Sequence, residues 1–191
     1  MALVDLAGRQ IRGKIVYYGP AYGGKTTNLE FIYRTVPAAA TGELHAIAAE
    51  NERTLFFDYF PLDLGTVNGF TIRYQLYTVP GQAHYERTRQ AVLSGADGVV
   101  FVADSAAERL VDNEQSLDEL RQHLLGQGKT LATMPFVVQY NKRDQPTALP
   151  TAELDQRLNP GAAMTVEAIA VSGAGVFETL RAICKLVTRS L

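Results

Sequence analysis

Cysteine is almost missing from this sequence and charges of one sign form no block, and each absence excludes a class of protein. Among 191 residues there is one cysteine, Cys184, so the chain forms no internal disulfide, which is typical of a reducing compartment. The formal net charge is −2, and lysine and arginine do not gather in any block. The sequence therefore gives no indication of a nucleic-acid-binding surface.

Long apolar runs are missing as well. A helix that spans a bilayer needs roughly 18 consecutive apolar residues, and no run approaches that length. Residues 1–14, MALVDLAGRQIRGK, lack the basic segment and the apolar core of a signal peptide. Cys184 lies too far from the C-terminal TRSL to be a prenylation site. We expect a cytoplasmic protein with no direct membrane anchor.

The chain does contain the composition of a soluble globular protein. Apolar residues make up 47% of it and charged residues 20%, unlike a disordered chain. The length suffices for one domain with a full hydrophobic core, and no repeat, low-complexity tract or linker divides it. We expect residues 1–191 to form one domain.

Short apolar strands and amphipathic helices alternate along the sequence. Two β-rich runs joined by the polar turn TVNG predict a hairpin, and beyond it strands and helices alternate. This order predicts an α/β fold with a mostly parallel six-stranded sheet, helices on both faces and ligands at the carboxyl ends of the strands. The expected strands are 11–19, 54–65, 69–79, 98–104, 134–141 and 164–171, and helical stripes begin near residues 29, 110 and 176.

The stretch GPAYGGKT, residues 19–26, lies between the first expected strand and the first expected helix. It matches G-x-x-x-x-G-K-[ST], in which glycines let backbone N–H groups face phosphate oxygens at a helix N-terminus. Lys25 is expected to reach the β- and γ-phosphates, and the Thr26 hydroxyl to ligate Mg²⁺. The alternative is a glycine-rich turn that binds nothing. The expected phosphate-binding residues are Gly19, Ala21, Gly23, Gly24, Lys25, Thr26 and Thr27, with Gly81 from a later loop.

A second motif, NKRD at residues 141–144, ends another expected strand. The Asp144 carboxylate can accept hydrogen bonds from the ring N1–H and the exocyclic amine of guanine, whereas adenine has an acceptor at N1 and no amine at C2. The alkyl stem of Lys142 can lie against the base, and Asn141 can brace the loops. In the later stretch EAIAVSG, the Ala170 N–H is expected to donate to guanine O6. These residues favour GTP and GDP over ATP.

The stretch TVPGQ, residues 78–82, follows the expected hairpin and has the residue types that hydrolysis requires. Gly81 can bring its N–H to the γ-phosphate, and Gln82 is suited to orient the attacking water. A glycine hinge beside a nucleotide also allows a loop with two states, one held by the γ-phosphate and one released after hydrolysis. The alternative for Gln82 is an ordinary exposed turn residue.

Residues 37–52 have no clear period and many small residues, which predicts a long loop, and such loops are usually functional. Just beyond it, Thr54 is a candidate to complete the coordination of Mg²⁺ in the GTP state, and Thr41 is a competing candidate. Arg53 is a candidate arginine finger supplied in cis, although a surface arginine before a strand is more often only solvated.

Other polar residues have ordinary expected roles. His45, His84 and His123 show no metal-binding spacing, and we expect them at surface or loop positions. Arg87 and Arg89, on the helix expected after TVPGQ, are expected to be solvated.

The phosphate loop, a switch threonine, x-x-G, N-K-x-D and the alanine of S-A together resemble the Ras-like small GTPases over nearly the whole chain. The aspartate that this family has before x-x-G, which holds Mg²⁺ through water, is Thr78 here, and Ile169 replaces the serine of S-A. The substitution at Thr78, with IVYYGP, GKTTNLEFIY, LYTVPGQ and GVVFVADS, closely resembles the bacterial MglA-type GTPases of gliding motility and cell polarity.

The resemblance implies a cytoplasmic switch that cycles between GTP and GDP with slow intrinsic hydrolysis. It also implies a Roadblock-fold, MglB-like activating protein that repositions the switch loops, and it leaves the effector unidentified. Carried over residue by residue, it implies that Arg53 and Gln82 are the catalytic pair and that Thr54 is the switch threonine.

Ala21 departs from the resemblance, because that family usually has glycine at this position. A Cβ there points toward the space that Gln82 and Arg53 must enter, so we expect modest crowding of the transition state with GTP binding little changed. Ala21 and Thr78 favour an alternative function, an interaction module that holds nucleotide and seldom cuts it. A third alternative, a P-loop kinase or ATPase, needs an adenine or acceptor-substrate site that the sequence does not show.

Overall fold

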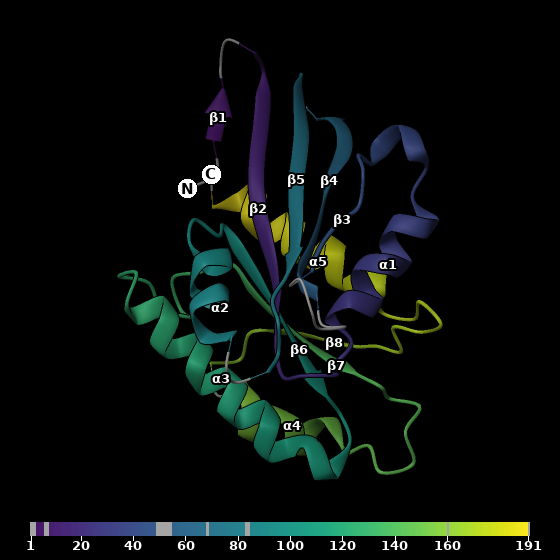
Figure 1. The fold of residues 1–191 in the computed structure, drawn as a ribbon, viewed down its shortest axis with the longest axis vertical. Helices are drawn as coiled ribbons and strands as arrows, with labels where there is room; N and C mark the ends of the chain where they lie inside the picture. Colours follow the sequence, from purple (N-terminus) through teal and green to yellow (C-terminus); the bar gives the residue numbers. More distant parts are fainter. Residues whose placement is uncertain are drawn as a thin grey trace.

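One eight-stranded sheet runs through the protein (Figure 1). The computed structural model describes residues 3–5, 8–48, 55–67, 69–82, 85–159 and 161–190. The strands are β1 (Leu3–Asp5), β2 (Gln10–Tyr18), β3 (His45–Ala48), β4 (Leu55–Val67), β5 (Phe70–Thr78), β6 (Gly98–Asp104), β7 (Phe136–Asn141) and β8 (Met164–Glu167). Their order is β3-β4-β5-β2-β6-β7-β8, with β1 paired to β2 outside this path. The neighbours from β5 to β8 pair in parallel, and β1, β3 and β4 pair antiparallel with β2, β4 and β5, respectively.

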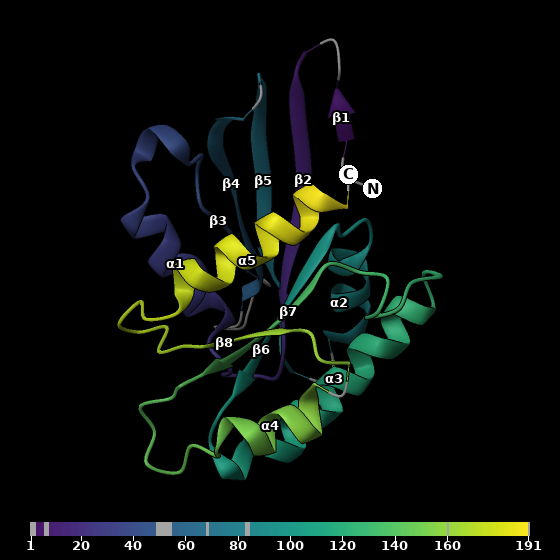
Figure 2. The same ribbon diagram turned by 180° about the vertical axis from the view of Figure 1, so that it is seen from behind.

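Helices cover both faces of the parallel part of the sheet. They are α1 (Lys25–Thr35), α2 (Glu86–Leu93), α3 (Leu110–Leu125), α4 (Thr151–Leu158) and α5 (Val176–Arg189), with short 3₁₀ turns at Ala38–Ala40 and Ala107–Arg109. Helices α2, α3 and α4 lie on one face in Figure 1, and Figure 2 shows α5 crossing the opposite face, on which α1 also packs.

Each face of the sheet has its own hydrophobic core. Because successive residues of a strand point to opposite faces, Val100 and Val102 of β6 join the core under α1 and α5, whereas Val99 and Phe101 join the core under α2, α3 and α4. All residues of β6 are buried, as expected for a central strand of a parallel sheet covered on both faces. The predicted α/β fold is confirmed.

The six predicted strands are all present, and the short strands β1 and β3 are additional. β3 falls within residues 37–52, which the sequence predicts as a loop, and residues 49–52 lie outside the described residues. The backbone of β4 explains β3, because an edge strand exposes a row of unpaired N–H and C=O groups that a short antiparallel partner can satisfy. β8 ends at Glu167, before the expected end, because the chain then turns and bridges Ile169 to Ala174.

Candidate functional site

A cavity of about 380 Å³ lies where the parallel strands end. It brings together the phosphate loop after β2, the end of β5 with the loop that follows, and one residue of β4. The lining residues are Ala21, Tyr22, Gly24, Lys25, Thr26, Thr27, Asp58, Thr78, Val79, Pro80, Gly81 and Gln82.

Backbone geometry explains why two positions of the phosphate loop are glycine. Gly19 and Gly24 have φ values of +141° and +99°, which side chains rarely allow. A Cβ on Gly19 would collide with the Val102 carbonyl of β6, and a Cβ on Gly24 would collide with the side-chain amide of Asn141 on β7. The loop approaches these strands this closely only because glycine occupies both positions.

Lys25 begins α1 and is buried beneath the loop. Its Nζ donates to the carbonyl oxygens of Gly19 and Pro20, at 2.9 and 2.6 Å. Burial first, and the positive charge of Arg89 second, lower the pKa of Lys25 from 10.5 to about 7. Anionic phosphate oxygens at this position would favour the ammonium form and raise the pKa again.

A buried carboxylate faces the predicted magnesium ligand. The Thr26 hydroxyl donates to Asp58 Oδ2 at 2.7 Å, and the Thr78 hydroxyl donates to the same oxygen at 3.1 Å. Thr78 Oγ1 in turn accepts the Asp58 N–H at 2.8 Å. A buried carboxylate from the neighbouring strand therefore lies beside Thr78, and two hydroxyls fix its position.

Sequence reasoning missed Asp58, although the hairpin contains a signal for it. Alternation in β4 places Asp58 on the same face as the buried Phe60 and Leu62, where a carboxylate needs a partner. The pairing of Tyr59 with Tyr77 puts Asp58 beside Thr78. The register of a long hairpin is difficult to fix from sequence alone, and this residue depends on it.

The loop after β5 packs directly on the phosphate loop. Gly81 lies so close that a Cβ on it would collide with the backbone of Ala21. Gln82 lines both the main cavity and a second cavity of about 460 Å³ that is bounded by α3. From the turn before α3, Arg109 donates to the Ala21 carbonyl at 2.8 Å and thereby holds the loop from this second side.

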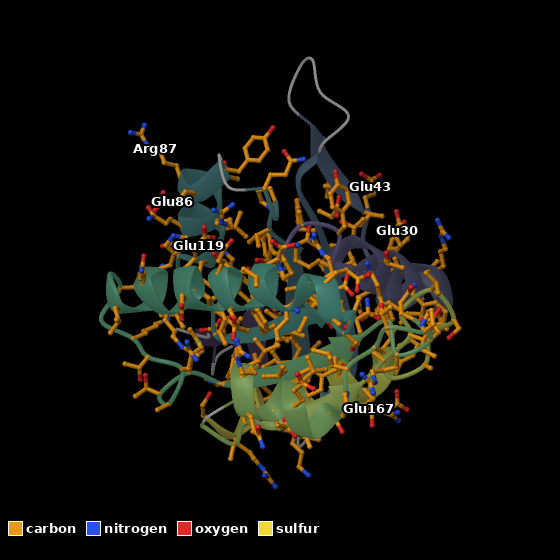
Figure 3. All side chains as sticks on the ribbon, turned by 90° about the horizontal axis from the view of Figure 1, so that it is seen from below. Glu30, Glu43, Glu86, Arg87, Glu119 and Glu167 are labelled. Carbon is orange, nitrogen blue, oxygen red and sulfur yellow. The ribbon has the colours of Figure 1, made fainter. Side chains whose placement is uncertain are left out.

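Arg89 on α2 is 1% exposed, so the prediction that it is solvated is wrong. Its guanidinium donates to the carbonyl oxygens of Pro80 and Gln82 and pairs with Glu119 of α3 at 3.1 Å. Figure 3 shows Glu119 between α2 and α3, while Arg87 projects away from the body, as predicted for a solvated residue. Arg89 thus ties the Gln82 backbone to two helices.

One histidine also departs from expectation. His123 on α3 is buried, and its Nδ1 shares a 3.2 Å hydrogen bond with the Tyr18 hydroxyl. The prediction of a surface or loop position is therefore wrong for His123, because it lies on the core face of α3. His45 is exposed as expected, and His84 lies outside the described residues. The part of the chain that the structure describes contains no cluster of three metal-binding side chains.

On the other side of the site, Asn141 joins two loops. Its Nδ2 donates to the Gly23 carbonyl of the phosphate loop, and its Oδ1 accepts the Ala170 N–H, both at 2.9 Å. The expected bracing role of Asn141 matches this geometry. The Ala170 N–H, expected to donate to guanine O6, donates to Asn141 here, and Asp144 is exposed in the turn that follows.

Lys142 is anchored to the end of β6. Its Nζ donates to the buried Asp104 carboxylate at 2.6 Å. Arg109 also approaches Asp104, with its Nε 3.9 Å away. Asp104 therefore fixes Lys142 of the NKRD motif and lies next to the residue that holds the Ala21 carbonyl.

Three predicted residues remain, Arg53, Thr54 and Thr41. Arg53 and Thr54 lie outside the described residues. Thr41 forms a bridge with Leu62 of β4 and does not line the main cavity.

Comparison with known proteins agrees with this geometry. The model of the ADP-ribosylation factor family matches residues 2–187. Over its full length the chain is 48% identical to the Mutual gliding-motility protein MglA of Myxococcus xanthus (strain DK1622), of which it covers 98%. ADP-ribosylation factor-like protein 4D from Homo sapiens is 32% identical over 66% of this chain and 63% of its own length, and its Bos taurus counterpart is 36% identical over 50% and 44%.

No helix among the described residues is long and apolar enough to cross a membrane. The family match spans almost the whole chain, including the phosphate loop, the hairpin and the NKRD strand. The chain belongs to the ADP-ribosylation factor family of Ras-like small GTPases, and it is an enzyme that binds GTP and GDP and hydrolyses GTP.

Proposed function

We propose that this GTPase is a molecular switch of the MglA type, which cycles between GTP and GDP to control cell polarity or motility from the cytoplasm. The observation that supports this most strongly is 48% identity over the whole chain with a Mutual gliding-motility protein. The threonine before x-x-G, Thr78, with its carboxylate partner on β4, fits a site that departs from the common Ras-like pattern. We further propose that residues 1–191 form one GTPase domain.

In the proposed site, the backbone and side chains of residues 19–27 hold the phosphates, with Lys25 neutralising the β- and γ-phosphate charge. Gly81 donates its N–H to the γ-phosphate. Lys142 and Asp144 recognise guanine, while Asn141 and Ala170 shape the base pocket. Support comes from the meeting of these loops at one edge of the sheet and from the contacts of Asn141 with two of them.

The residues present fit a magnesium ion. The Thr26 hydroxyl and the buried Asp58 carboxylate are hard oxygen donors, and they lie 2.7 Å apart. We propose that Thr26 and Thr54 hold Mg²⁺ and that Asp58, positioned by Thr78, supplies the negative charge beside it. When bound, Mg²⁺ neutralises charge on the β- and γ-phosphates.

For hydrolysis, Gln82 orients the attacking water and Arg53 supplies positive charge to the γ-phosphate. Gly81 packs against Ala21, and on this proposal the loop that carries Gln82 changes this contact when a γ-phosphate is bound. A Roadblock-fold, MglB-like activator that repositions the switch loops accounts for how a slow intrinsic enzyme becomes fast. The effector of the GTP state is a further, unidentified protein.

A single-turnover phosphate-release assay tests this function, with and without a purified Roadblock-fold protein. We expect release that the activator accelerates and that Gln82→Leu and Arg53→Ala each abolish, while Arg87→Ala, at an exposed position of α2, changes it little. The alternative, a nucleotide-bound interaction module, is favoured by the contact of Gly81 with Ala21. Release that stays at background with any activator would support the alternative, and unchanged release in Gln82→Leu and Arg53→Ala would overturn their assignment as the catalytic pair.

A further inference from the structure

A buried network of side-chain amides lies beneath the nucleotide site. Asn28 and Gln139 exchange two hydrogen bonds, with Asn28 Nδ2 donating to Gln139 Oε1 at 2.8 Å and Gln139 Nε2 donating to Asn28 Oδ1 at 3.0 Å. Gln139 Nε2 also donates to Thr179 Oγ1 at 2.8 Å, and that hydroxyl donates to the Gly175 carbonyl. Asn28, Gln139 and Thr179 are all 0% exposed.

The network joins the three elements that carry the three nucleotide loops. Asn28 lies on α1 directly after the phosphate loop, and Gln139 lies on β7 two residues before Asn141. Thr179 lies on α5, which begins after the loop that contains Ala170. Asn28 and Thr179 therefore lie in the first turn of their helices, next to a loop of the proposed site, and Gln139 lies two residues before the NKRD motif.

The Asn28–Gln139 pair forms one polar layer, and the hydrogen bonds of Asn141 form a second layer next to the nucleotide site. Residues two apart on a strand share a face, so Gln139 lies under Asn141. Asn141 holds the phosphate loop through the Gly23 carbonyl, and Asn28 Nδ2 holds the next carbonyl, that of Gly24, at 2.9 Å. The end of the phosphate loop is thus fixed from above and from below to the strand that carries NKRD.

Stability alone does not explain these amides. Burying an amide costs free energy unless every hydrogen bond is made, and replacing both partners of a buried pair by apolar groups of similar shape is often nearly neutral. Residues close to the network on the same three elements, Leu29, Val137 and Leu180, belong to the hydrophobic core on this face of the sheet. What amides add over apolar side chains is direction, because their hydrogen bonds fix one relative position of α1 and β7.

We propose that Asn28 and Gln139 are positioning residues that set the distance between the phosphate loop and the base-binding loops, so that one nucleotide engages both. This inference rests on the proposed assignment of those loops. GDP and GTP share the span from base to β-phosphate, so both are held by this spacing. Asp58 and Gln82, proposed for the magnesium site and for hydrolysis, line the same cavity as the phosphate loop and are not part of the network.

The test separates position from stability by comparing single variants with a double variant. Asn28→Leu and Gln139→Met each leave the amide oxygen of the other residue without its donor, and we expect each to lower the melting temperature and to release fluorescent GDP faster. The double variant Asn28→Leu/Gln139→Met replaces both partners with side chains of similar size. We expect it to recover most of the melting temperature and still to release GDP and GTP about tenfold faster than wild type, which corresponds to about one net hydrogen bond.

Tyr74→Phe is the matched control for a lost buried hydrogen bond. The Tyr74 hydroxyl contacts the Cys184 carbonyl and Thr188 at 3.3 and 2.8 Å, on β5 and α5 away from the cavity. We expect this variant to lose stability without faster nucleotide release. Should the double variant fail to fold, Gln139→Met compared with Tyr74→Phe at equal melting temperature decides the same question.

Wild-type release, measured in the same assay, shows whether the proposed loops bind nucleotide at all, which is a separate question. If wild type holds GDP and the double variant releases GDP and GTP at the wild-type rate, the positioning role is overturned. A change confined to GTP would overturn it as well, because the spacing is common to both nucleotides.

Discussion

The base side and the hydrolysis side of the site are built differently. On the base side, Asn141 joins the phosphate loop to the Ala170 loop, and Lys142 is anchored to a buried carboxylate. On the hydrolysis side, Gly81 packs against Ala21, and Gln82 is held by its backbone carbonyl through Arg89. The loops of the first are joined by side-chain hydrogen bonds and an ion pair, and the second is a loop that packs on its neighbour.

The contrast indicates how binding and hydrolysis are separated in this protein. On the proposed assignment of the loops, we expect the preorganised base side to bind either nucleotide, and we expect hydrolysis to require that the TVPGQ loop change its contacts. Asp58 belongs to the part of the hydrolysis side that is already fixed, because two hydroxyls hold its carboxylate. The following changes should affect one side and spare the other.

The largest effect is expected from Asp144→Asn on the base side. An amide cannot accept both guanine hydrogen bonds, so the affinity for GDP should fall roughly 10³-fold or more. Xanthine carries a carbonyl where guanine carries the amine, so the amide should gain affinity for xanthosine diphosphate. Competition binding with both nucleotides measures this change of preference from guanosine diphosphate to xanthosine diphosphate. Asp118→Asn, an exposed position on α3, is the control, and retained GDP preference in Asp144→Asn would contradict the assignment.

Asp58→Asn should impair hydrolysis and spare nucleotide binding. Removing the negative charge beside Thr26 should lower the single-turnover rate about 10²-fold and raise the Mg²⁺ concentration needed for half-maximal rate. GDP affinity measured in chelator should change little. Asp63→Asn, on the same strand and paired with Arg73 at the surface, is the control. Wild-type magnesium dependence in Asp58→Asn would show that the carboxylate serves only the fold.

Lys25 of the phosphate loop should make the affinity for nucleotide depend on pH. Its pKa is lowered to about 7, by burial first and the charge of Arg89 second, and bound phosphate should raise it. Below pH 7 the lysine is protonated with or without nucleotide, so binding moves no proton. Above pH 7 binding takes up a proton, and affinity should fall by up to about tenfold per pH unit.

Calorimetry in buffers of different ionisation enthalpy measures this uptake directly. We expect close to one proton taken up at pH 8 and almost none at pH 6. Proton release at pH 8 would contradict the proposed contact of Lys25 with phosphate.

Ala21→Gly should have the smallest effect. Removing the Cβ gives Gln82 and Arg53 more room, so activator-stimulated turnover should rise by less than about tenfold while GTP affinity stays close to wild type. Stopped-flow phosphate release with saturating activator measures it. Equal or lower turnover in the glycine variant would refute crowding by Ala21.

The parts predictable from sequence are those whose signals are local. The phosphate loop and NKRD are short motifs flanked by clear strands and helices, and their surroundings match expectation. Asp58 could not be assigned because its role depends on the register of β4 against β5. The sequence does not place Arg89 and His123 correctly, because a polar residue on a helix is ordinarily expected to face solvent. Only their tertiary partners, Glu119 and Tyr18, show why they are buried.

The most direct test measures GDP release and GTP hydrolysis in parallel, with and without a Roadblock-fold activator. The account predicts that the activator raises the single-turnover hydrolysis rate at least about tenfold while guanine preference and Asp144 dependence remain those of the free protein. An activator that binds but leaves the hydrolysis rate unchanged, or hydrolysis that is equally fast without it, would contradict a preorganised base side combined with a hydrolysis side that must be assembled.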